Sequence, residues 1–464
     1  MSAAVWPSRA RPGSRGAEIV ANALSLFGTT IITSVSGFGF WWLAAHLFSA
    51  RTVGSGSAAI SALQLLGDVG MLGLGTLLIG ELPKGGTAQR ELLSTALAVA
   101  TAAGVVLGLG FALLTTVASP GLPTVPGGAA GITMFVAAVA VTAALLVLDD
   151  ATVGLSRANW QLWRNTAFSV LKLAVLPVLA LAARADGPAG LVGAWLAGAV
   201  LSIALVAGLA QRADGRLLAR PRWQLVRAYR GTALTHHWLN LSSGAPRLIL
   251  PVLVAAFLGP AANAGFYIAL LFAGFAYIVP VHLSTALFAV ASGDRAALAQ
   301  VLRRAVFISA VTGAASAVVF CFGGHLALSL FGGRYVAASG VLAILGLATF
   351  ASGVKSLYIA VCRVNGDLRR CALVCGLGSG AEVLVPAFAL AQHRPLELVS
   401  FCLLVTMTVE ALVLWPSVAV VGGLGEVARV LPKHAAALLQ WTAPGALPAG
   451  AEHGGPPAHW GPEP

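Results

Sequence analysis

Six ionisable residues of this chain stand inside long apolar stretches, where a charge costs free energy unless it is paired or used. They are Arg247, Lys172, Lys355, Asp68, Glu382 and Glu410. Ionisable groups at this depth commonly contact a substrate or an ion, or pair with one another. We interpret the three cations as contacts for an anionic substrate and the three acids as candidates for coupling or gating.

Arg247 gives the clearest signal of the six. It lies about eleven residues into its apolar run and therefore ~16 Å deep, too deep for its side chain to reach the interface easily. The neighbouring Pro246 and Pro251 predict a broken or kinked helix there. Together with Lys172 and Lys355, Arg247 predicts a cationic inner cavity that would concentrate an anion such as a pyrophosphate.

Structural alternatives exist for these residues. Asp68 and Arg247 could pair across the molecule as a lock, and Lys355 could reach the inner interface. The stretch 28–37 is rich in glycine, serine and threonine. Such a face allows close helix approach and also bending, and ordinary packing of small residues is the alternative.

The elements that hold these residues are predicted to be membrane helices. Of the 464 residues, 58% are hydrophobic and 9% are charged, and the mean hydropathy is +0.88. A soluble domain carries about 25% charged residues, so the composition excludes a water-soluble globular protein. The high apolar content also excludes a disordered chain. We predict an all-α polytopic membrane protein.

Twelve apolar runs are long enough to cross ~30 Å of hydrocarbon. They are residues 19–48, 54–79, 92–117, 130–148, 166–183, 190–211, 236–258, 262–291, 305–324, 339–361, 371–391 and 397–422. With the N-terminus in the cytoplasm, 21 of the 28 basic residues fall in inside segments and 4 in outside loops. This bias predicts a cell-membrane protein with both termini cytoplasmic, and it explains most of the +12 net charge without nucleic acid.

The chain divides into two similar halves. The expected parts are a basic tail (1–18), a six-helix bundle (19–211), a basic amphipathic linker (212–235), a second six-helix bundle (236–422) and a mostly disordered tail (423–464). The pattern R-x-N-x-x-L-x-R occurs at 157–164 and again at 363–370, an offset of 206. At that offset Lys355 corresponds to Asp149. Parallel repeats of this kind place a site at their interface near the midplane.

Several kinds of chemistry lack support in the sequence. It contains no phosphate-binding loop and no zinc motif. Asp149 and Asp150 form an acidic pair, but no base or metal motif accompanies them. We therefore predict no enzyme activity, no catalytic residues, no metal and no cofactor.

Motifs along residues 20–420 resemble those of polysaccharide flippases. The motifs are FWWLAAHLFS (40–49), DVGMLGLGT (68–76), ELP (81–83), PR (246–247), LGPAANAGFY (258–267) and LFGGRY (330–335). These flippases belong to the superfamily of multidrug, oligosaccharidyl-lipid and polysaccharide exporters. The resemblance implies two six-helix bundles around a V-shaped cavity that opens alternately to each side. The first, second, seventh and eighth spans would line the central groove.

The cargo that the resemblance implies is a lipid-linked oligosaccharide, a polyprenyl-pyrophosphate glycan. It would move from the inner to the outer leaflet during biosynthesis of cell-surface polysaccharide. Implied partners are this substrate, membrane lipids and other polysaccharide-assembly proteins. The basic Arg247 agrees with the position before the second bundle's gate where such proteins often carry a basic residue. Twelve spans rather than fourteen distinguish the chain from peptidoglycan-precursor flippases.

Three other functions remain open. A cation-coupled drug or metabolite antiporter of the same superfamily would use acids such as Asp68, Glu382 and Glu410, although the deepest charges are mainly basic. A polytopic glycan polymerase or glycosyltransferase would need a larger outer loop or an acidic metal motif. A different twelve-helix facilitator would carry an acidic-glycine-basic signature, which residues 81–86 lack.

Overall fold

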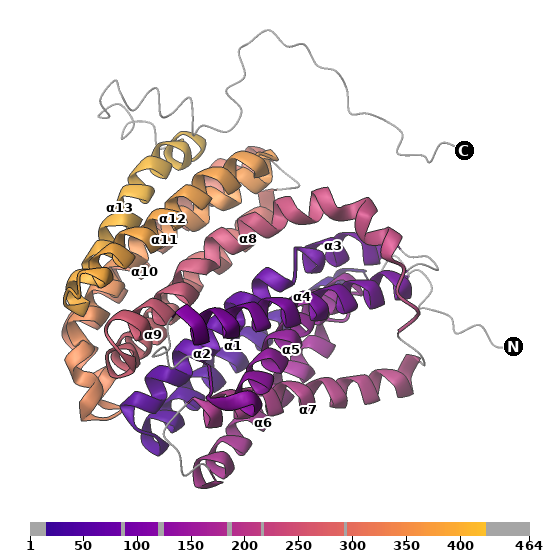
Figure 1. Cartoon of the computed structure of the whole chain (residues 1–464). Coiled ribbons are helices and arrows are strands. Elements are labelled where there is room, and N and C mark those ends of the chain that lie inside the picture. Colours follow the sequence, from indigo (N-terminus) through magenta and orange to yellow (C-terminus); the bar gives the residue numbers. More distant parts are fainter. Residues whose placement is uncertain are drawn as a thin grey trace, which may run out of the picture.

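The computed structural model describes residues 15–84, 89–118, 125–182, 188–214, 218–291 and 295–423, and helices dominate these ranges (Figure 1). The first half holds α1 (Arg15–Leu47), α2 (Ala50–Gly70), α3 (Leu74–Glu81), the short η1 (Leu82–Lys84), α4 (Gln89–Ala118), α5 (Gly128–Gly154), α6 (Ala158–Ala182) and α7 (Ala189–Asp214). The second half holds α8 (Trp223–Phe257), α9 (Pro260–Ala291), α10 (Arg295–Ser329), the short η2 (Gly333–Ala338), α11 (Ser339–Asn365), α12 (Leu368–Ala391) and α13 (Leu396–Val421).

Most of these helices are suited to a membrane. Within the described residues, nine are long and apolar enough to cross one, and ten if the bent pair α2 and α3 is one span. In α8, the apolar part covers Gly244–Phe257. With α1 and α8, which have 33 and 35 residues, the arrangement is compatible with the twelve predicted spans.

The two halves pack in the same way. In the N-terminal bundle (α1–α7), α1 packs on α6, α5 packs on α2, α4 and α7, and α6 packs on α7. In the C-terminal bundle (α8–α13), α8 packs on α12, α11 packs on α9, α10 and α13, and α12 packs on α13. Each contact in one bundle therefore has a counterpart in the other. This correspondence is the structural form of the repeat.

The second span is interrupted, which the uninterrupted run 54–79 did not predict. Helix α2 ends at Gly70, and the axis turns by 50° before α3 continues. Leu72 and Gly73 both have left-handed backbones, with φ of 51° and 73°. Two such residues in succession cannot continue a right-handed helix. Hydropathy averaged over a run does not detect this break.

Helix α8 is continuous through Pro246 and Pro251, so of the two alternatives expected there, a broken or a kinked helix, the break is not found. Both prolines lie inside α8, and the helix curves gradually along its length (Figure 1). Prolines are tolerated within membrane helices where neighbouring groups and small adjustments satisfy the freed carbonyls. The same helix begins at Trp223, so it includes much of the segment 212–235 that the sequence assigned to a linker.

The bundles meet most closely where α2 crosses α9. A Cβ on Gly54 would lie 1.7 Å from the carbonyl oxygen of Pro260, so only glycine fits. The side-chain amide of Asn263 donates to the Gly54 carbonyl at 2.8 Å and to Ser57 Oγ at 3.0 Å. All of these groups lie near the start of α2 and of α9, which fixes one end of the interface.

The same end is closed by further contacts between the bundles. Phe38 of α1 makes edge contacts with Phe272 of α9 and with Phe331, with ring centroids 5.4 and 5.0 Å apart. Trp42 Nε1 donates to the Leu330 carbonyl at 2.9 Å. Arg334 donates to carbonyls at the end of α1. We call this the closed end. In Figure 1 the bundles converge there, at lower left, and separate toward the opposite end.

Candidate functional site

A cavity of about 420 Å³ lies between the two bundles. Its walls come from α1, α2, α6 and α7 on one side and from α8 and α9 on the other. Polar and aromatic side chains alternate around it. The polar members are Thr33, Ser34, Ser61, Gln64, Lys172 and Arg247, and the aromatic members are Trp41, Phe168, Trp195, Tyr267, Phe275 and Tyr277. The four helices that the resemblance places around a central groove, α1, α2, α8 and α9, all contribute.

Lys172 projects from α6 into a cage of aromatic rings. Its ammonium lies 4.7 Å from the centroid of Phe168, 5.0 Å from Trp195 and 5.5 Å from Phe40. The residue is only 4% exposed. Each desolvated cation–π contact stabilises the charge by about 2 kcal/mol, whereas removing an ion from water costs several kcal/mol. Three such contacts together are of the same order as this cost, so the rings can hold the charged ammonium in a buried position.

The backbone beside Lys172 is shaped by a glycine of the next helix. A Cβ on Gly198 of α7 would lie 3.0 Å from both the nitrogen and the Cβ of Lys172. The missing side chain lets α7 approach α6 closely. This approach brings Trp195, one turn earlier on α7, against the lysine ammonium.

Arg247 lies across the cavity from Lys172, on the other bundle. It is exposed, and it interacts electrostatically with Asp68 of α2 and with Tyr267 of α9. Among the described residues no ion pair joins Arg247 to Asp68. The tight lock considered from the sequence is therefore absent here, and the guanidinium can contact a ligand.

The serine- and threonine-rich face of α1 forms part of the wall. Thr33, Ser34 and Gly37 line the cavity. Gly28, which lies more than one helical turn before Thr33, packs on Leu162 of α6. Different residues of this stretch therefore pack on a neighbouring helix and line the cavity. Trp41 packs on Tyr267 with ring centroids 4.6 Å apart, which joins the bundles at the end of the cavity.

Lys355 does not join the other two cations. Its ammonium donates to Ser379 Oγ at 2.8 Å, to Glu410 Oε2 at 3.0 Å and to Glu382 Oε1 at 3.1 Å. Lys355, Glu382 and Glu410 come from α11, α12 and α13, and all are buried. The structure thus places these three predicted site residues in one ionic cluster within the C-terminal bundle. Lys355 neither lines the cavity nor extends alone to the interface.

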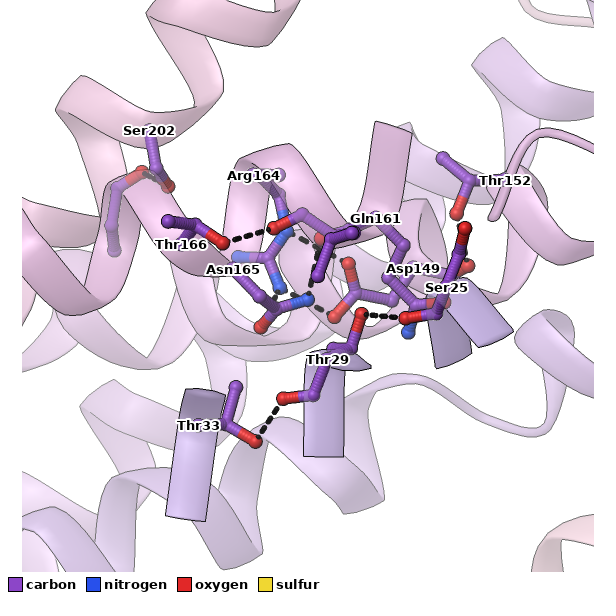
Figure 2. A network of polar contacts seen from close by, with 12 residues as sticks. Ser25, Thr29, Thr33, Asp149, Thr152, Gln161, Arg164, Asn165, Thr166 and Ser202 are labelled. Atoms are coloured by element: carbon purple, nitrogen blue, oxygen red, sulfur yellow. Dashed lines mark hydrogen bonds and ion pairs between the residues drawn. The ribbon is translucent and has the colours of Figure 1, made fainter. Parts of the chain in front are cut away.

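The N-terminal bundle holds another ion pair, in which Arg164 is buried and Asp149 is partly buried. Arg164 of α6 donates to both carboxylate oxygens of Asp149 on α5, at 2.8 and 2.5 Å, and to Asn165 Oδ1 at 2.8 Å. Figure 2 shows this network beside the hydroxyl groups of Thr29 and Thr33 on α1. Asp149 and Lys355, which the sequence motif paired at an offset of 206, lie on the corresponding helices α5 and α11 but at different distances from the helix ends Gly154 and Asn365. Each bundle therefore has an ion pair on this helix, with the sign of the charge reversed and at a different level.

The charges of the cavity wall are all positive. None of the described residues that line it is acidic, and Asp68 lies near Arg247 without belonging to the wall. In the described residues, no group of three or more histidine, cysteine or acidic side chains is arranged to hold a metal ion. The arrangement can bind an anion between two cations and pack flat groups against aromatic faces.

Several wall residues were not identified from the sequence. Phe168 stands four residues before Lys172, and this spacing on a helix could have indicated contact. Phe40, Trp195 and Tyr267 lie on other helices, so no local pattern connects them with Lys172 or Arg247. The partners of Lys355 were missed for the same reason.

Solved structures with the same architecture are transporters. An inward-facing multidrug resistance MATE family transporter of the MOP superfamily matches with a TM-score of 0.59 and 15% identity, covering 88% of this chain and 99% of that one. The chain has the MATE fold. A mutant of the Vibrio cholerae MATE transporter VcmN matches with a TM-score of 0.60 and 15% identity over 89% of this chain and 98% of the other.

A third match with the MATE fold is a MOP superfamily transporter from Pyrococcus furiosus. Its TM-score is 0.57 at 13% identity, over 91% of this chain and 96% of that chain. No family model matches the sequence, and no curated protein matches it either. The MATE fold and the apolar helices together make this chain an all-helical, multi-pass membrane protein.

Proposed function

We propose that this chain is an alternating-access transporter that moves a polyprenyl-pyrophosphate-linked oligosaccharide from the inner to the outer leaflet. The observation that carries the proposal is the cavity between the bundles, where Lys172 and Arg247 face each other from opposite halves and no lining residue is acidic. A pyrophosphate has two negatively charged phosphate groups, and the oxygens of each accept strong hydrogen bonds. Arg247 suits it as a bidentate donor, and Lys172 suits it as a buried point charge.

The cavity also has groups that suit a glycan. Thr33, Ser34 and Gln64 offer hydroxyl and amide groups for hydrogen bonds, and Trp195 and Phe275 add aromatic rings to the wall. The polyprenyl tail needs no path of its own, because it can remain in the lipid while the head group crosses. Transport then requires only that the two bundles rock about the cavity so that each end opens in turn.

The distribution of basic residues along the chain indicates which side of the membrane the open end of the bundles faces. If the basic segments are cytoplasmic, the closed end of the bundles faces outward, and the structure is an inward-facing state. Such a state would accept cargo from the inner leaflet. No catalytic step is part of this mechanism, and its partners are the lipid-linked substrate, membrane lipids and other polysaccharide-assembly proteins.

A drug or metabolite antiporter is the second candidate, because solved proteins of this fold include a multidrug resistance transporter. Asp68, in electrostatic contact with Arg247, is the acid nearest the cavity that could bind a coupling cation. The positive charge of the cavity wall argues against binding of a cationic drug or a coupling cation there. The Pyrococcus furiosus protein is a precedent, since the reverse polarity of its pocket is said to suggest a different function.

The test is to delete the gene and to identify, by mass spectrometry, the lipids that accumulate. Under the flippase proposal a lipid-linked oligosaccharide collects on the inner leaflet, and the wild-type gene restores its export. An Asp68→Asn variant should still restore it. If no lipid-linked glycan accumulates and Asp68→Asn abolishes drug efflux, the antiporter is correct. A new covalent glycan product from purified protein would instead indicate a polymerase or glycosyltransferase.

A further inference from the structure

A second cavity, separate from the one between the bundles, lies within the N-terminal bundle. It measures about 430 Å³ and is bounded by α4, α5 and α7, by the start of α6 and by Leu218. It shares no lining residue with the cavity that holds Lys172 and Arg247. We call it the N-bundle groove.

The walls of the groove change from polar to apolar along its length. Gln89, Arg90 and Gln211 line it at the end where α4 begins and α7 ends, and Leu97 and Ala144 line its deeper part. Along α5 the lining runs from Ala144 to Leu155, a rise of ~16 Å. One leaflet of a ~30 Å hydrocarbon core is about 15 Å deep. The groove therefore has the length of one acyl chain in one leaflet.

The polar end of the groove carries positive charge. Arg90 is part of the wall, and the guanidinium of Arg157 lies 4.5 Å above the ring of Trp160, which also lines the groove. None of the described lining residues is acidic. The sequence places both arginines in cytoplasmic segments, where anionic lipids attract basic residues. An apolar trough that ends in arginines is complementary to an acyl chain that ends in an anionic phosphate.

The rim of the groove is held in place by the connection between the two bundles. The backbone N–H of Ala219 donates to Ser94 Oγ at 2.9 Å, and that of Arg222 donates to Thr95 Oγ1 at 2.8 Å. The side chain of Arg222 also pairs with Glu91 at 2.9 Å. These contacts fix residues 218–222 on the first turns of α4, with Leu218 against the groove. The groove is thus a built feature rather than a gap between loosely placed helices.

We propose that the N-bundle groove binds one anionic phospholipid of the inner leaflet. One acyl chain occupies the apolar trough, and the phosphate lies against Arg90. A lipid in this position touches Leu218 and so contacts the segment that joins the two halves. This proposal does not depend on the identity of the transported cargo.

The test is native mass spectrometry of the full-length protein, purified from nanodiscs with equal amounts of phosphatidylglycerol and phosphatidylethanolamine. The wild type should retain one phosphatidylglycerol. Ala207→Phe, which fills the groove from α7, should lose it, whereas Ala102→Phe, at an exposed position of α4 outside the groove, should keep it. Arg90→Gln should reduce the preference for the anionic lipid about fivefold, and Arg304→Gln, exposed on α10, should not.

Three outcomes would overturn the proposal. Equal lipid retention by Ala207→Phe and Ala102→Phe would show that the groove holds no particular lipid. An unchanged preference in Arg90→Gln, with a melting temperature equal to that of the wild type, would remove the head-group contact. Displacement of phosphatidylglycerol by added polyprenyl phosphate at equal concentration would assign the groove to the tail of the cargo instead.

Discussion

At the residue scale, the two cations of the central cavity are stabilised in different ways. Lys172 is buried among three rings, while Arg247 is exposed and interacts with Asp68. A buried lysine is a compact charge whose side chain has little conformational freedom. An exposed arginine side chain can change its conformation so that the planar guanidinium fits a ligand. The pair thus provides one fixed and one adaptable contact for an anion.

Arg247→Ala should abolish export while membrane insertion stays normal. Loss of one charge-assisted contact weakens cargo binding by about 2–3 kcal/mol, which is roughly a 30- to 150-fold loss of affinity. Arg247→Lys should recover part of the activity, because lysine keeps the positive charge but lacks the planar guanidinium that donates two parallel hydrogen bonds. The measurement is restoration of surface polysaccharide in the deletion strain, and full export by Arg247→Ala would remove this residue from the site.

Lys172→Met should reduce export but leave the protein folded. The thioether fills similar space among the rings and makes favourable contacts with them, and no buried charge is left uncompensated. Export and thermal unfolding are measured on the same preparations. A variant that exports at the wild-type rate would restrict Lys172 to a packing role.

Lys355→Met, unlike Lys172→Met, should destabilise the folded protein. Removing the ammonium leaves Glu382 and Glu410 buried without their cation, and breaking a buried pair from one side costs about 3–5 kcal/mol. We expect a large loss of thermal stability in detergent. Adding Glu382→Gln and Glu410→Gln to this variant should recover part of the lost thermal stability. If the two acids have a coupling role, this triple variant should be stable but unable to transport.

At the element scale, the contact between α2 and α9 depends on the absence of a single side chain. The Gly54 position allows the start of α9 to approach the α2 backbone, and Asn263 then bridges to the Gly54 carbonyl. Glycine in a soluble helix is usually a cost, but between membrane helices it permits the close packing that holds them together.

Gly54→Ala should therefore loosen the closed end. The added carbon would overlap the Pro260 carbonyl, and relief of such overpacking typically costs about 1–3 kcal/mol. The matched control is Gly110→Ala on α4, where no atom lies within 4 Å of the new Cβ. A thermal unfolding scan should show a lower midpoint for Gly54→Ala only, and equal midpoints would contradict the close contact.

At the scale of the whole molecule, the bundles touch unequally. Helix α2 packs extensively on both α8 and α9, whereas α1 barely contacts α9, although the repeat makes the pairs α2–α8 and α9–α1 equivalent. The asymmetry leaves the α1–α9 side free for movement. The closed end is then held by the aromatic contacts of Phe38 and by the hydrogen bonds of Trp42 and Arg334.

The double variant Trp42→Phe, Arg334→Gln should open the closed end more often. Loss of these hydrogen bonds is worth about 1–2 kcal/mol, a shift of roughly tenfold in the ratio of the two states. Ser34→Cys, placed in the cavity wall of a cysteine-free background, reports the change when a membrane-impermeant thiol reagent is added outside cells. The single variant Trp163→Phe, exposed on α6, is the control and should label as slowly as the unaltered chain.

Much of this architecture follows from local properties of the sequence. The apolar runs predicted the helices, because helix length is a property of contiguous residues. Two similar halves were also predicted, although the first copy of the motif (157–164) begins between α5 and α6 and the second (363–370) begins inside α11. The depth of Arg247 and Lys172 likewise follows from their place in a run. Local backbone geometry was harder to predict: α2 is interrupted at Leu72 and Gly73, and α8 continues through Pro246 without a break.

The partners of each charge were decided by the tertiary structure alone. Lys172 and Lys355 are equally deep in their runs, yet one faces aromatic rings at the cavity and the other faces two carboxylates. Which groups meet depends on how helices cross and rotate against each other, and some of the residues that meet stand 288 and 289 positions apart. The sequence by itself therefore determined which residues are in the membrane, and the packing of the helices decided which of their charges remain available to a ligand.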